Sequence, residues 1–186
     1  MVRPHWVIAL YCVKAILVLD QEGGRLCARY FTDDWGPLDK QLAFEKQLHK
    51  KAQPHAQIIA LDNNVIVYKN SGDVAFYVVG DSDENELLLE SVLSTLTEAI
   101  SFLLRADEST WNQVDRRTLA ENLDYLYLVV DELVDGGIVL ESDPKAIADR
   151  VAMRDTAAEA SGGSGGPISE QTIAKAFSVA KDIFMG

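Results

Sequence analysis

Five short runs in the first half of the chain are rich in apolar and β-branched residues and are separated by polar turn residues. Runs of this length, bounded by Gly, Asn, Asp and Ser, are typical of strands. The first two runs flank a Gly-Gly turn and predict a hairpin, and the last three predict a meander. We therefore expect a sheet built from residues 13–19, 25–31, 57–61, 65–69 and 74–79.

Two segments have apolar side chains at the three- and four-residue spacing of a helix that covers a core. The first, residues 37–52, starts at a proline and ends just before the next one. The second is residues 87–104, and Asp83 with Glu86 three positions later forms a capping-box pattern ahead of it. We expect helices over both segments.

The second half of the chain is predicted to be mainly helical. A third helix is expected over residues 115–134, stopped by Gly136 and Gly137, because glycine readily takes the left-handed backbone at a helix end. A short extended run over residues 138–140 follows, and Pro144 suits the first position of a short further helix.

The order of elements also predicts the domain organisation. No strand–helix–strand crossover repeats, which favours an α+β domain over a doubly wound one, with a mainly antiparallel sheet flanked by helices. We expect this domain over residues 1–152 and a Gly/Ser-rich linker over residues 153–167. Residues 168–186 then carry a short amphipathic helix that could dock on a partner.

Composition narrows the classes of function. The 186 residues carry a formal net charge of −12, and no dense basic face is evident, so nucleic-acid binding is not expected. The apolar run over residues 6–19 is interrupted by Lys14 and is too short to span a bilayer. A core strand is favoured there over a secretory signal, because a small-residue cleavage site is missing. Cys12 and Cys27 lie in strand-like runs as small hydrophobes, which suits a reducing compartment.

Residues that could carry out chemistry do not cluster in the sequence. The three histidines are scattered, and the two cysteines have no zinc-binding spacing. Residues 81–85 resemble a calcium loop but lack its glycine and its distal glutamate. The glycines after position 161 lack the Gly-Lys-Ser/Thr ending of a phosphate-binding loop. We therefore predict no enzyme activity, no metal site and no cofactor.

The second and third predicted helices carry more apolar residues than one core-facing stripe needs. Two interpretations remain open: the helices pack on each other and on the sheet, or a partner chain covers the excess, since large exposed apolar patches are rare on monomers. Under the second interpretation the partner-binding residues are Leu88, Val92, Tyr125 and Val129.

Several strings of residues between positions 13 and 152 resemble the coatomer zeta subunits, and more distantly the sigma small chains of clathrin adaptors. The most specific string is VDELVDGGIVLESDP at residues 130–144. The others are VKAILVLD at residues 13–20, AFEK at 43–46, VYK at 67–69, FYVVG at 76–80 and ENEL at 84–87.

The resemblance implies a longin-like (SNARE-like) fold and a structural subunit that pairs with the coatomer gamma subunit in the heptameric COPI coat. It also implies recruitment by the GTPase Arf to the cytosolic side of Golgi and COPI vesicle membranes, for retrograde Golgi-to-ER and intra-Golgi transport. Membrane contact would then pass through other subunits, which agrees with the acidic charge.

The sigma chains bind acidic dileucine sorting peptides, and the resemblance carries three positions of that pocket onto this chain. Arg25 would be the basic residue, with Val74 and Thr97 in the apolar part. A solvated strand arginine is the plainer interpretation of Arg25. Three other functions remain open: a clathrin-adaptor-like small chain, a longin-type module that binds a small GTPase or sorting peptide, and an enzyme with an unfamiliar site.

Overall fold

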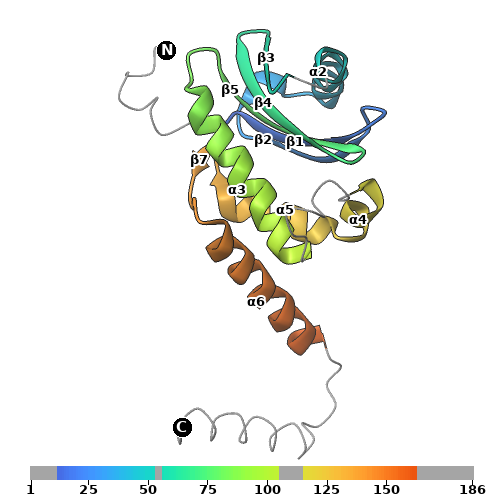
Figure 1. Cartoon of the computed structure of the whole chain (residues 1–186), viewed down its shortest axis with the longest axis vertical. Coiled ribbons are helices and arrows are strands. Elements are labelled where there is room, and N and C mark those ends of the chain that lie inside the picture. The colour runs from blue at the N-terminus through green and yellow to red at the C-terminus, as the bar shows by residue number, and fades with distance from the viewer. Residues whose placement is uncertain (1–11, 53–55, 105–114, 163–186) are drawn as a thin grey trace, which may run out of the picture. The chain divides into compact units, whose positions relative to one another are not determined.

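The computed structural model describes residues 12–52, 56–104 and 115–162 (Figure 1). Contacts divide the chain into two compact units, residues 1–152 and 153–186, and the first contains a five-stranded antiparallel sheet in the order β2-β1-β5-β4-β3. This confirms the predicted sheet. Its strands are β1 (Ala15–Asp20), β2 (Arg25–Tyr30), β3 (Ile58–Leu61), β4 (Asn64–Ser71) and β5 (Val74–Asp81).

Strand β1 is an interior strand of the sheet, next to the edge strand β2, and is buried along its whole length. It pairs with β2 on one side and with β5 on the other. Ile16 and Val18 point into one core, and Leu17 and Leu19 point into a second core across the sheet. A strand covered on both faces reads as a continuous apolar run, which is the pattern of residues 15–19.

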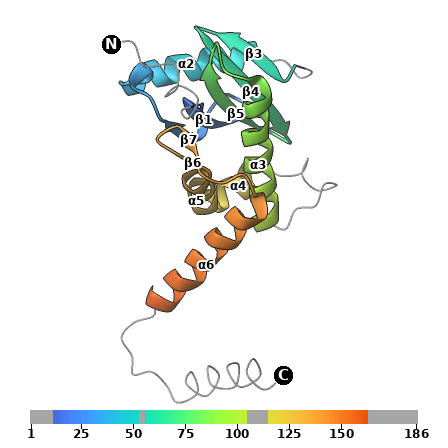
Figure 2. The ribbon, with the colours of Figure 1, turned by 90° about the vertical axis from the view of Figure 1, so that its left-hand side faces the viewer.

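Helices cover both faces of the sheet (Figures 1 and 2). One face packs against α2 (Leu38–Lys51) and the short 3-10 helix η1 (Asp33–Trp35). The other packs against α3 (Glu86–Leu104) and α5 (Leu123–Leu133). Among the described residues, two further helices are α4 (Arg116–Glu121) and α6 (Pro144–Gly162).

The prediction of one helix over residues 115–134 is wrong in two respects. The segment breaks at Asn122, whose backbone has φ −127° and ψ 36° and whose side-chain amide donates to the Thr118 carbonyl at 2.8 Å. Such local side-chain bonds compete with the helical ladder. Gly136 and Gly137, at φ 55° and 87°, form the turn of a hairpin between β6 (Val134–Asp135) and β7 (Ile138–Val139).

Two helix ends also differ from prediction. The side chain of Asn85 accepts the Leu87 N–H at 2.9 Å, so Asn85, and not Asp83, caps the start of α3. Helix α6 continues to Gly162, which corrects the linker predicted from residue 153. The rest of that linker, the predicted helix over residues 168–186 and the first part of the apolar run, residues 6–11, lie outside the described residues.

Candidate partner interface

Two of the four residues predicted to meet a partner lie inside the protein's own core. Val92 is 3% exposed and Val129 is fully buried, where α3 and α5 pack on each other and on the sheet. Tyr125 is half-buried against the same core. The prediction is therefore wrong for Val92 and Val129, because the extra apolar width of the two helices is used in internal packing.

The composition of α3 reflects its place between the sheet and α5. Its length and apolar character would suit a membrane span. Its core-facing residues are instead buried against strands β4 and β5 and helix α5, namely Leu89, Leu93, Leu96 and Ile100. A core helix of this kind gives no indication of a membrane anchor.

The start of α3 presents large apolar side chains to solvent. Leu87 is 77% exposed and Leu88, the fourth predicted residue, is 36% exposed. Leu140, 58% exposed, directly follows β7. The segment of Cys12 and Val13 lies beside both elements: a Cβ on Gly80 would meet both Leu89 of α3 and the Cys12 carbonyl oxygen, and the Val13 N–H donates to the Gly137 carbonyl in the turn before β7, at 3.2 Å. We call Leu87, Leu88 and Leu140 the leucine patch.

The three residues predicted to form a sorting-peptide pocket do not come together. Arg25 lies on the α2 face of the sheet and binds both carboxylate oxygens of Glu45, at 2.6 and 3.1 Å. Val74 and Thr97 are buried at 2% and 1% exposure on the α3 side. The predicted pocket is therefore wrong, because the sheet separates its basic residue from its apolar ones.

Arg25 belongs instead to a polar network that joins α2 to β2. Glu45 is only 2% exposed and also accepts the Tyr30 hydroxyl at 2.8 Å. Burial raises the pKa of Tyr30, and the hydrogen bond to Glu45 raises it further. Burial opposes the charge on Arg25, yet its hydrogen bond with Glu45 keeps its pKa above the ordinary value. Because each charge is matched, the network holds the helix on the sheet.

The described ranges include the two cysteines and several of the candidate metal ligands considered from the sequence. They contain no group of three His, Cys, Asp or Glu side chains that could hold a metal ion. Cys12 and Cys27 are unbridged and buried, as expected of small hydrophobes. Burial raises the pKa of Cys27 to about 11, so its thiol is a poor nucleophile at neutral pH.

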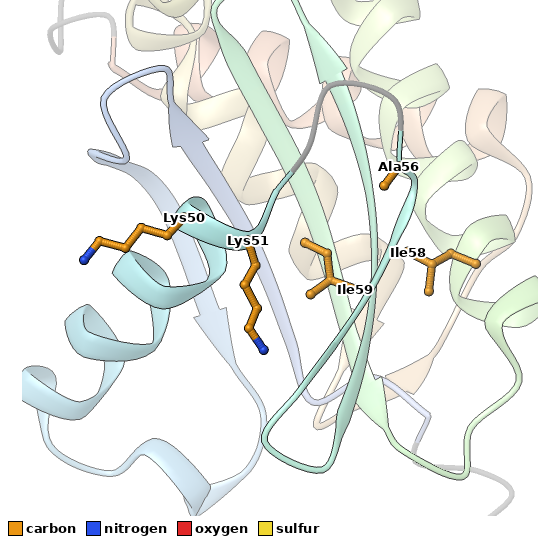
Figure 3. A pocket seen from close by; sticks show the side chains of 5 residues that line it. All are labelled: Lys50, Lys51, Ala56, Ile58 and Ile59. Atoms are coloured by element: carbon orange, nitrogen blue, oxygen red, sulfur yellow. The ribbon is translucent and has the colours of Figure 1, made fainter.

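A pocket of about 470 Å³ lies between the end of α2 and strand β3 (Figure 3). Its lining combines two cations with aliphatic side chains: Lys50, Lys51, Ala56, Ile58 and Ile59. Reasoning from the sequence missed it, although the basic end of α2 was a visible signal.

Comparisons with known proteins agree with this architecture. A family model for the clathrin adaptor complex small chain matches residues 12–158. Human coatomer subunit zeta-1 is 42% identical over 175 residues, covering 94% of this chain and 91% of the relative. Coatomer subunit zeta-2 of Arabidopsis thaliana is 43% identical over 175 residues, covering 91% of each.

A structural comparison gives the same fold. A chain of a homology model of the full-length AP-3 complex, in a stretched open conformation, superposes with a TM-score of 0.60 and 20% identity. The match covers 83% of this chain and 99% of the other, and it supports the longin-like α+β fold. On the sequence relationships, the protein belongs to the clathrin adaptor complex small-chain family and groups within it with the coatomer zeta subunits.

Proposed function

We propose that this protein is the zeta-type structural subunit of a COPI coat, and that it works by pairing with the coatomer gamma subunit. The observation that carries the proposal is the 42% identity with human coatomer subunit zeta-1 over 175 residues. That similarity extends over nearly the whole of both chains. In this role the protein serves retrograde Golgi-to-ER and intra-Golgi transport and performs no chemistry.

The properties of the chain support this role. Two leucines side by side in the sequence at the start of α3 are exposed, and solvent-facing apolar patches mark protein-binding sites. We propose that the leucine patch, including Leu88, contacts the gamma subunit. The net charge of −12 disfavours direct binding to anionic lipid, so recruitment by Arf and contact with the Golgi membrane pass through other subunits.

Co-expression with the coatomer gamma trunk, followed by size-exclusion chromatography with mass determination, tests the proposal. We expect a stable one-to-one complex. The double variant Leu87→Ser, Leu88→Ser should weaken the complex about tenfold or more, because it removes apolar contact area at an interface. It should leave the free chain folded, since exposed positions tolerate substitution.

Phe102→Ser is the matched control, because Phe102 lies near the other end of α3 and is 53% exposed. It should bind the gamma trunk like the native chain. A native chain that stays monomeric beside the gamma trunk would contradict the proposed function. Equal loss of binding in both variants would reject the leucine patch as the contact site.

A further inference from the structure

The two edge strands of the sheet differ in how far other elements cover them. Strand β2 forms one edge and packs against α5. Arg29 of β2 forms an ion pair with Asp131 of α5 at 2.5 Å, and its guanidinium lies over the Tyr127 ring of the same helix. Strand β3 forms the other edge. A side chain of α2 reaches it there, because Lys51 donates a hydrogen bond to the Ala60 carbonyl at 3.4 Å. The edge at β3 is therefore the more accessible one.

The register of β3 shows which of its backbone groups face outward. The Tyr68 N–H donates to the Gln57 carbonyl at 2.9 Å, and Ile59 lies opposite Ile66. Bonded and non-bonded pairs alternate in an antiparallel ladder, so the N–H and C=O groups of Ile58 and Ala60 point away from β4. The Ala60 carbonyl accepts a long hydrogen bond from the exposed side chain of Lys51, at 3.4 Å, which agrees with this direction. A strand that pairs with β3 would displace this lysine contact and use the outward backbone groups of Ile58 and Ala60.

The side chains beside this edge define the chemistry of a ligand. Ile58 is 51% exposed, whereas Ile59 is buried under α2. Figure 3 shows Lys51 extending between α2 and β3. Neither Lys50 nor Lys51 forms an ion pair with a carboxylate of the described ranges. Four of the nine lysines of this acidic chain lie in α2, at positions 40, 46, 50 and 51.

We propose that the α2–β3 pocket binds an extended acidic segment of a partner protein, which adds to β3 as a sixth strand. The β3 edge supplies backbone hydrogen bonds, Ile58 supplies an apolar contact, and the positive charges of Lys50 and Lys51 attract carboxylates. A second copy of this chain is a poorer occupant, because pairing β3 with β3 would bring the lysine-rich ends of two α2 helices together.

Solution NMR of the full ¹⁵N-labelled chain tests the inference with the peptide EVEVEVE as the acidic probe. We expect saturable shifts at residues 56–60 and at least tenfold slower hydrogen exchange of the Ile58 and Ala60 amides. The Ile59 amide should change little, because it already faces β4. The peptide KVKVKVK should not bind. Shifts confined to other elements, or equal binding of both peptides, would overturn the inference.

Variants separate charge from strand pairing. Lys51→Glu should weaken EVEVEVE binding about fivefold or more, whereas Lys46→Glu, on the same helix but outside the pocket lining, should bind normally. Ala60→Pro removes an outward N–H and should abolish peptide binding while the β3–β4 pairing stays intact.

Self-pairing of the chain is the competing outcome. Slower hydrogen exchange of the Ile58 and Ala60 amides that appears with rising protein concentration, in the absence of peptide, would indicate self-pairing and contradict the inference. The chain is tested alone, so the result does not depend on the gamma subunit.

Discussion

Glu45 shows how one buried carboxylate can fix the position of a helix. It belongs to α2, yet its hydrogen-bonding partners Arg25 and Tyr30 belong to β2. An uncompensated charge at 2% exposure would be strongly unfavourable. The pair therefore disfavours any packing of α2 on the sheet that separates these side chains.

Removing the partner of Glu45 should be costly. We expect Arg25→Ala to lower the free energy of unfolding by about 2–3 kcal/mol, because it leaves the buried carboxylate unpaired. Arg117→Ala is the matched control: Arg117 pairs with Glu121 on the surface, at 85% exposure, and should change stability by less than about 0.5 kcal/mol. Urea denaturation followed by circular dichroism measures both. Equal stability of the two variants would rule out a structural role for the Arg25–Glu45 pair.

The sequence could not reveal this pair, because its two members are twenty residues apart and only the folded register brings them together. Arg25 therefore looked like a solvated or cargo-binding strand residue. The same limit explains Val92 and Val129: helical periodicity identified them as apolar flank residues, but not whether the neighbour that covers them is this chain or another.

At the scale of elements, the contact between α3 and β5 depends on a glycine. A Cβ atom on Gly80 would lie 2.7 Å from the Leu89 Cδ1 and 3.1 Å from the Cys12 carbonyl oxygen. The leucine tip could move, but the backbone oxygen of the neighbouring segment could not move without shifting the chain. Gly80 thus lets α3 approach the sheet closely.

Adding one methyl group there tests this contact. Gly80→Ala should destabilise the protein by about 1–3 kcal/mol through overpacking. Gly36→Ala is the control, because its Cβ would meet only the Asp33 carbonyl oxygen at 3.7 Å, and it should be neutral or stabilising by up to about 1 kcal/mol. Chemical denaturation measures the free energy of unfolding of both variants. A Gly80→Ala variant as stable as Gly36→Ala would show that α3 does not need the close approach.

Elements with strong periodicity were predictable from the sequence, and their boundaries were less so. All five strands and the first two helices appear where the apolar runs predict them. The third helix was misjudged because Leu123 and Leu126 continue the apolar spacing while Asn122 breaks the backbone between them and α4. At Gly136 and Gly137 the same left-handed geometry serves a helix stop or a hairpin turn, and local sequence does not separate the two.

At the scale of the whole molecule, the family assignment and the physical properties of the chain agree. The described core is that of an adaptor small chain, and it leaves the leucine patch and the β3 edge accessible. The resemblance in the sequence was enough to predict the family. Periodicity indicated only Leu88 of the leucine patch, and it did not indicate the β3 edge. The leucine patch depends on where α3 starts, and the β3 edge depends on the order of strands in the sheet.

The most direct test of the zeta role is competition for one site on the coatomer gamma trunk. Fluorescently labelled human coatomer subunit zeta-1, 42% identical to this chain, is bound to the gamma trunk and titrated with the unlabelled protein, with fluorescence anisotropy as the readout. A shared site predicts complete, saturable displacement. No displacement by a chain that is folded by circular dichroism would contradict the assignment of this protein to the zeta position of the coat.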